Sequence, residues 1–242
     1  MSETLRLALV VEGPTDKVVI EAAISSILDA RPFVLNQLQP EMSLAFGANV
    51  GFGPRGGGWG GVYRWCRQAS ARSGGSLDAD PLFEVHDVLI LHLDADVASE
   101  RYRSANIHES PGDLPCVEPC PPARETTDRL RRVMLGWVGE ATTPARTVLC
   151  TPSKSIDAWV VAALFPSDPA VLDGNHECRS HGQQPLRLRI DKSQSEYEHH
   201  GATLSEAWLT VTEICTEARR FSDDFRGAVQ LVDAIANATN GC

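Results

Sequence analysis

Acidic residues directly follow two apolar segments of this chain, and this pattern strongly limits the fold. The first segment covers residues 5–11 and precedes Glu12, and the second covers residues 85–93 and precedes Asp94. Both segments are typical of buried strands, whereas unpaired carboxylates almost never lie inside a core. Open α/β sheets build their sites where strands end. We therefore expect a functional site at the carboxyl ends of two strands.

The remaining chain alternates between strand and helix patterns. Further predicted elements are helices over residues 16–28, 62–71, 126–138 and 156–165, strands over 42–46 and 146–150, and a Gly-rich segment without helix or strand over 47–61. This order predicts an α/β fold, with a mostly parallel sheet flanked by helices, over residues 1–165. Residues 166–242 would form a polar connection and a helical C-terminal extension, with helices at 204–221 and 223–237.

Composition indicates an ordinary globular protein. Of 242 residues, 43% are hydrophobic and 22% charged, and no apolar run approaches the ~18 residues that span a bilayer. No signal peptide is recognisable, so we expect a cytoplasmic protein without a membrane partner. The seven cysteines have irregular spacing, which favours reduced thiols. The alternative is a zinc site formed by Cys116, Cys120, His176, Cys178 and His181.

The acids after the two strands predict a metal site. Asp94 and Asp96 are two residues apart, and in an extended strand both would point to one face. Two such carboxylates repel each other unless a cation lies between them, and oxygen ligands suit Mg²⁺ or Mn²⁺. If the strands are neighbours, Glu12 converges on this pair. Asp16 lies one helical turn after Glu12 and would face the same ion.

Two further segments contain candidate residues. In Pro152–Trp159 a strand runs into a helix, where Lys154 would stabilise charge on a phosphoryl group and Asp157 would bind metal or orient Lys154. The alternative for Lys154 is a solvated turn. The Gly-rich segment has neither Walker A nor GxGxxG spacing. It would approach phosphates with Arg55 as a substrate-binding residue, or it would be a surface loop.

The net charge of −10 argues against a general nucleic-acid binder. Metal ions would neutralise a catalytic acid cluster, however, and arginines are grouped locally, as at Arg64, Arg67 and Arg72. Each group could also be a solvated face. His92 lies between two leucines of a predicted strand and is expected to be packed, facing opposite to them.

The motifs together resemble the Toprim domain, which topoisomerases, bacterial primases, small RNA-maturation nucleases and overcoming-lysogenization-defect-type nucleases share. The resemblance lies in Glu12-Gly13 after one strand and Asp94-x-Asp96 after a later one. Val11–Asp16 is closest to the last group, in which a second acid follows the glutamate by four residues. Ser155–Trp159 resembles the Ser-x-Glu-Ala-Trp signature of small stand-alone Toprim-like proteins encoded beside ATPases in bacterial defence loci, with Asp157 replacing glutamate.

This resemblance implies a Mg²⁺-dependent nuclease that cleaves DNA or RNA. Glu12 would be general base or metal ligand, and Asp94 and Asp96 would hold Mg²⁺. Asp16 and Asp157 would complete a second metal position. Lys154 would stabilise the transition state. The resemblance also implies an anti-phage effector with an ABC- or AAA-type ATPase partner, since the chain has no ATPase motif of its own.

Two alternatives remain open. One is a catalytically silent Toprim-like subunit that a partner gates, and the other is a Mg²⁺-dependent phosphohydrolase acting on small molecules. Glu12 discriminates against the second, because a phospho-aspartate enzyme does not need it. The sequence does not determine the oligomeric state, and a homo-oligomer stays open.

Overall fold

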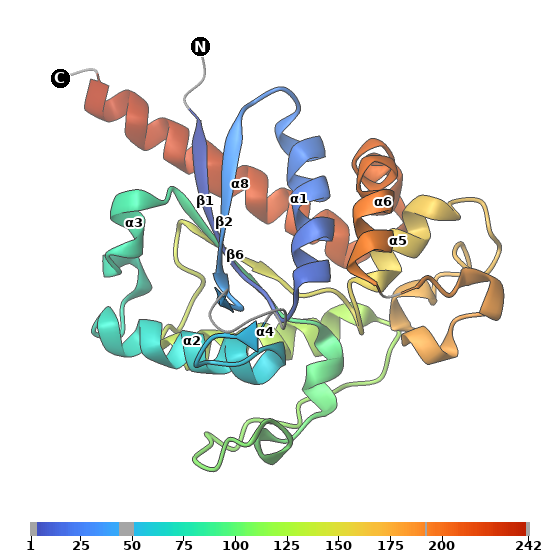
Figure 1. The fold of residues 1–242 in the computed structure, drawn as a ribbon, viewed down its shortest axis with the longest axis horizontal. Coiled ribbons are helices and arrows are strands. Elements are labelled where there is room, and N and C mark those ends of the chain that lie inside the picture. Colours follow the sequence, from blue (N-terminus) through green and yellow to red (C-terminus); the bar gives the residue numbers. More distant parts are fainter. Residues whose placement is uncertain (1–3, 44–50, 192, 241–242) are drawn as a thin grey trace.

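A parallel four-stranded sheet forms the centre of the molecule (Figure 1). The computed structural model describes residues 4–43, 51–191 and 193–240. The strand order is β2-β1-β5-β6, and all neighbours run parallel. The strands are β1 Leu5–Val10, β2 Phe33–Gln39, β5 Val88–His92 and β6 Thr147–Cys150. The predicted α/β class with a parallel sheet is therefore confirmed.

The two faces of the sheet pack against different helices, because successive side chains of a strand point to opposite sides. On one face Leu7 and Leu9 of β1 join Ile90 in a core with the first and the C-terminal helices. On the other face Val10 and Leu91 join the helices that precede and follow β5. The first core draws side chains from both sides of residue 165.

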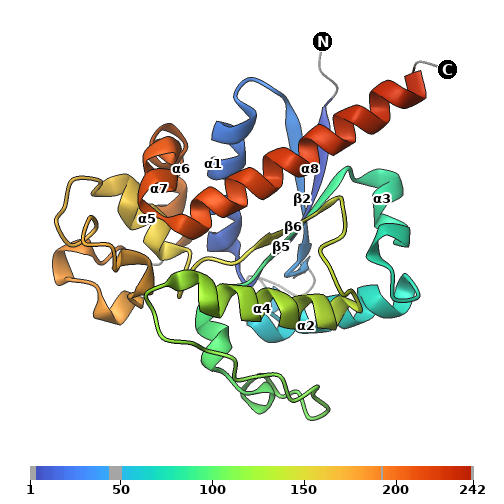
Figure 2. The same cartoon turned by 180° about the vertical axis from the view of Figure 1, so that it is seen from behind.

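Helices cover both faces, as Figures 1 and 2 show from opposite sides. The first core packs α1 Pro14–Leu28, α5 Asp157–Leu164, α6 Gln194–Glu206, α7 Trp208–Ile214 and α8 Thr216–Asn240. The second packs α2 Gly58–Arg72 and α4 Ala123–Val138, and the short α3 Leu82–Val85 lies beside it. The 3-10 helices are η1 Leu77–Ala79, η2 Ala95–Ser99, η3 Tyr102–Ala105, η4 His176–Cys178, η5 His181–Gln183 and η6 Leu186–Leu188.

Three predicted elements differ from the structure. The second strand of the sheet is β2, whereas the prediction placed it at residues 42–46. β3 Met42–Ser43 pairs instead with β4 Gly51–Phe52 in a separate ribbon, and residues 44–46 lie outside the described residues. The Gly-rich segment contains β4 and the start of α2, since side-chain packing offsets the low helix propensity of glycine. The C-terminal helices break at residues 207 and 215, and α8 continues through the predicted gap at 222.

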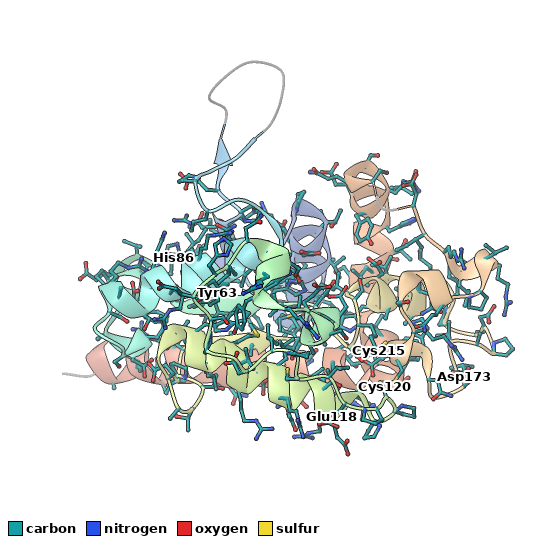
Figure 3. All side chains as sticks on the ribbon, turned by 90° about the horizontal axis from the view of Figure 1, so that it is seen from below. Tyr63, His86, Glu118, Cys120, Asp173 and Cys215 are labelled. Carbon is teal, nitrogen blue, oxygen red and sulfur yellow. A yellow bond between two sulfur atoms is a disulfide. The ribbon has the colours of Figure 1, made fainter. Side chains whose placement is uncertain are left out.

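The cysteine prediction was wrong for two residues. Cys120, in the long loop after η3, forms a disulfide with Cys178 of η4, with 5.5 Å between their Cα atoms. Figure 3 labels Cys120 where the loop meets the C-terminal region. Cys66, Cys116, Cys150 and Cys215 are buried free thiols. The disulfide removes two ligands from the alternative zinc site. None of the described helices is long and apolar enough to cross a membrane.

Candidate functional site

Four carboxylates gather at the carboxyl edge of the sheet. Glu12 follows β1, Asp16 lies in the first turn of α1, Asp94 follows β5, and Asp157 begins α5. β1 and β5 pair directly, with Val10 opposite Leu91, so the chain leaves both strands at the same place. Strand pairing therefore converts sequence separations of about eighty residues into direct contacts.

Glu12 and Asp94 are tied together through the backbone. The Asp94 N–H donates to Glu12 Oε1 at 2.9 Å, and Asp94 Oδ1 accepts from the Ile156 N–H at 2.9 Å. The Glu12 carboxylate thus fixes the backbone at Asp94, and the Asp94 carboxylate fixes the turn before α5. Charge-assisted bonds of this kind are stronger than neutral ones, so they hold the three segments in register.

His92 lies between two of the acids. Its side chain is fully buried, with Nε2 3.3 Å from Asp94 Oδ1 and Nδ1 3.8 Å from Asp16 Oδ2. It points away from Leu91 and Leu93, which pack in the opposite core, as predicted. Burial alone lowers the pKa of His92, but Asp16 and Asp94 raise it to about 9. His92 is therefore a buried cation within the acid cluster, a role that the sequence analysis did not assign.

Asp16 is fixed at the start of α1. Its Oδ2 accepts from the Gly13 N–H at 2.8 Å, which caps the helix. Burial, together with repulsion from Asp94, raises the pKa of Asp16 to about 6 even though His92 opposes the shift. Burial, followed by repulsion from Asp94, likewise raises the pKa of Glu12 well above its usual range. The cluster contains more negative charge than the protein compensates.

Asp157 receives a partner from the C-terminal region. The hydroxyl of Tyr197, a buried residue of α6, donates to Asp157 Oδ1. Burial and the nearby Asp157 raise the pKa of Tyr197, so the hydroxyl keeps its proton and remains a donor. Sequence reasoning missed Tyr197, which lies in a polar segment without a motif. A lone aromatic residue among polar neighbours was the only available signal.

Lys154 lies in a turn that is tied to the segment after β5. Its backbone has a φ of +61°, a left-handed conformation that is uncommon for a residue with a side chain. The carbonyls of Pro152 and Lys154 accept from the N–H groups of Ala95 and Asp96 at 2.9 and 3.2 Å. Such backbone strain persists where the surroundings enforce it, often at functional sites.

Two further predicted site residues lie in a 3-10 helix and in a turn. Asp96 is exposed and belongs to η2, because the strand ends at His92 and the chain then turns into a 3-10 helix. The premise of an extended strand carrying Asp94 and Asp96 on one face therefore fails. Arg55 lies beside the cluster, where its Nε donates to Gln39 Oε1 at 3.0 Å and its Nη2 lies 3.3 Å from Glu41 Oε2.

The four acids are not arranged as a ready metal site. Within residues 4–43, 51–191 and 193–240, no group of three or more His, Cys, Asp or Glu side chains has an arrangement that could hold a metal ion. The donor chemistry nevertheless fits Mg²⁺ or Mn²⁺, because four carboxylates share one region and the raised pKa values of Glu12 and Asp16 record their repulsion. A divalent cation would relieve that repulsion.

Comparisons with known proteins identify no relative. No family model matches the chain, and neither does any curated protein or solved structure.

Proposed function

We propose that this chain is a metal-dependent nuclease with a Toprim-like catalytic domain, cleaving phosphodiester bonds in DNA or RNA. The observation that carries the proposal is the gathering of Glu12, Asp16, Asp94 and Asp157 around a single histidine at the carboxyl edge of a parallel sheet. Burial and mutual repulsion make such acids costly to keep ionised, so their concentration in one place favours a functional role. The resemblance in sequence adds an anti-phage role with an ATPase partner.

Each residue has a defined task in this proposal. Glu12, with its raised pKa, accepts the proton of the attacking water. Asp94, Asp16 and Asp157 would hold a divalent cation, and His92 and the Ile156 N–H keep Asp94 oriented. When bound, the cation supplies Lewis-acid stabilisation of the phosphate. Lys154 faces the charge that develops on the phosphoryl group.

A partner-gated, catalytically silent subunit is the second candidate. The acids lack a metal-holding arrangement among the described residues, and Asp157 is bonded to Tyr197 of α6. A partner that moved α6 would release Asp157 toward the other acids.

Cleavage of a substrate panel tests the proposal. Purified protein with Mg²⁺ or Mn²⁺ is incubated with supercoiled plasmid, linear duplex, single-stranded DNA and total tRNA, beside Glu12→Gln, Asp94→Asn and the control Glu84→Gln, an exposed acid of α3. Loss of cutting in the first two variants alone supports a nuclease. If calorimetry shows that the wild type binds metal but no substrate is cut, the partner-gated subunit is favoured. If the wild type neither binds metal nor cuts any substrate, the proposed site is refuted.

A further inference from the structure

A cationic groove runs beside the acid cluster. It has a volume of about 680 Å³ and is lined by α2, the end of α4 and part of the long loop. Three arginines line it, Arg55, Arg64 and Arg67, and Glu109 is the only acid among its described lining residues. In a chain of net charge −10, this concentration of guanidinium groups is distinctive.

Neutral groups anchor two of these arginines. Arg64 donates from Nη1 to the Arg55 carbonyl at 3.0 Å and from Nη2 to the Ala105 carbonyl at 2.8 Å. Arg67, which is exposed, donates from Nη1 to the Trp137 carbonyl at 3.3 Å. Neither forms an ion pair with any residue that the structure describes. Carbonyls orient a guanidinium without neutralising it, so both keep charge and donors for an anion.

An aromatic wall accompanies the cations. Tyr63 is half-buried on the groove, and its ring lies 5.3 Å from that of Trp137 and 5.5 Å from that of Tyr102, both in edge-on geometry. Figure 3 labels Tyr63 on this face, seen from below. Packing against two rings holds Tyr63 rigidly, and its remaining exposed surface offers a stacking platform for a base.

The start of α2, the helix that lines the groove, contacts the backbone of Glu12. The N–H of Gly58, the first residue of α2, donates to the Glu12 carbonyl at 2.9 Å. At about 1.5 Å per helical residue, Arg64 and Arg67 lie roughly 9 and 14 Å farther along the axis of α2. Phosphates along one strand of B-DNA are about 3.4 Å apart along the helix axis, so a few nucleotides cover this distance.

We propose that this groove binds the phosphodiester backbone of a single-stranded nucleic acid, with Arg64 and Arg67 holding phosphates and Tyr63 stacking on a base. The choice of ligand rests on the proposed nuclease function. The combination of a concave shape, cations and an aromatic wall favours a single strand over a duplex, because unpaired bases can reach the ring.

A binding assay under conditions that prevent cleavage tests the proposed role of this groove. Anisotropy of labelled 20-nucleotide DNA and RNA strands is measured in chelator at several salt concentrations for wild type, Arg67→Gln, Arg64→Gln and Tyr63→Leu. The control is Arg226→Gln, which removes the same charge from an exposed position on α8. We expect each groove arginine variant to weaken binding about threefold to tenfold and to lower the slope of log K against log salt by about 0.7.

Three results would each contradict the proposal that the groove binds a single strand. The wild type binds neither labelled strand, the groove variants bind as tightly as Arg226→Gln, or a duplex of equal length binds the wild type more tightly than the single strand does. Arg67→Gln is exposed and keeps the proposal testable if Arg64→Gln fails to fold. A parallel Mn²⁺ assay separates the two proposals, because Glu12→Gln should bind like wild type without cutting. If Glu12→Gln loses cleavage while Arg67→Gln still binds the labelled strand like wild type, the groove proposal is refuted and the nuclease proposal stands.

Discussion

Two clusters of charged side chains in this protein differ in their balance. Where α4 meets α8, Asp128, Glu217 and Asp224 face Arg124, Arg131 and Arg220, an equal number of acids and guanidinium groups. Arg131 also donates to Thr151 Oγ1 at 2.8 Å and to the Leu149 carbonyl at 2.7 Å. At the carboxyl edge of the sheet, four acids gather around His92, which pairs with Asp16 and Asp94.

This difference separates a structural cluster from a functional one. Paired acids and guanidinium groups hold α4 and α8 together, and removing Arg131 leaves the buried Glu217 without its partner on α4. At the carboxyl edge of the sheet, burial and then repulsion from Asp94 raise the pKa values of Glu12 and Asp16, and a cluster with this cost is retained for what it can bind. We therefore expect mutations in the two clusters to have opposite effects on activity and stability.

The largest expected effect is on catalysis by the Glu12→Gln variant. The amide keeps the shape and can still accept from the Asp94 N–H, but it removes the proposed base and one negative charge. We expect cleavage to fall about a thousandfold, roughly 4 kcal/mol of transition-state stabilisation. Urea denaturation should show stability equal to wild type or higher. A variant that loses stability along with activity would make Glu12 structural.

The Arg131→Met variant should show the reverse pattern. It leaves Glu217, which is almost fully buried, without its nearest cation on α4, and breaks the bonds to Thr151 and Asp224. Breaking a buried charged network typically costs about 3 kcal/mol or more. Chemical denaturation should reveal this loss, while cleavage per folded molecule stays close to wild type. Arg226→Met, at an exposed position, serves as control, and equal stability of the two variants would contradict the comparison.

A pH series should sharpen the comparison further. The pKa of Asp16 rises from 3.8 to about 6 on folding, so the folded state binds this proton more tightly than the unfolded chain. This proton stabilises the fold fully below the unfolded pKa of 3.8, and the stabilisation, roughly 3 kcal/mol in total, is lost as pH rises through about 6. The free energy of unfolding of wild type minus that of Asp16→Asn, measured in chelator from pH 4 to 7, should decline accordingly. A flat or rising difference would refute the shift.

The strand-end acids could be predicted because hydrophobic runs fix β1 and β5 and their ends. Glu12 and Asp94 converge because β1 and β5 are neighbours, which the sequence analysis could only assume. β2 was missed because it is an edge strand whose polar positions give a weak apolar signal. The 3-10 helix that contains Asp96 was not predicted, because a local 3-10 turn is not visible in periodicity. Tyr197 depends on how α6 packs on α1, a long-range contact without a sequence pattern.

The smallest expected effect tests whether that long-range contact serves the site. Tyr197→Phe removes only the hydroxyl that donates to Asp157 Oδ1. Loss of one buried hydrogen bond costs about 1 kcal/mol, and loss of a group that orients a metal ligand weakens metal binding about tenfold or more. Ser222→Ala is the matched control, because it also removes one buried hydroxyl from the same helical layer; this hydroxyl accepts from Trp208 Nε1 at 2.9 Å and donates to the Ala218 carbonyl at 3.0 Å. Calorimetric titration with Mn²⁺ should show weaker binding for Tyr197→Phe alone, although both variants lose similar stability. If both bind Mn²⁺ like wild type, Tyr197 only supports the fold, and the C-terminal helices have no part in metal binding.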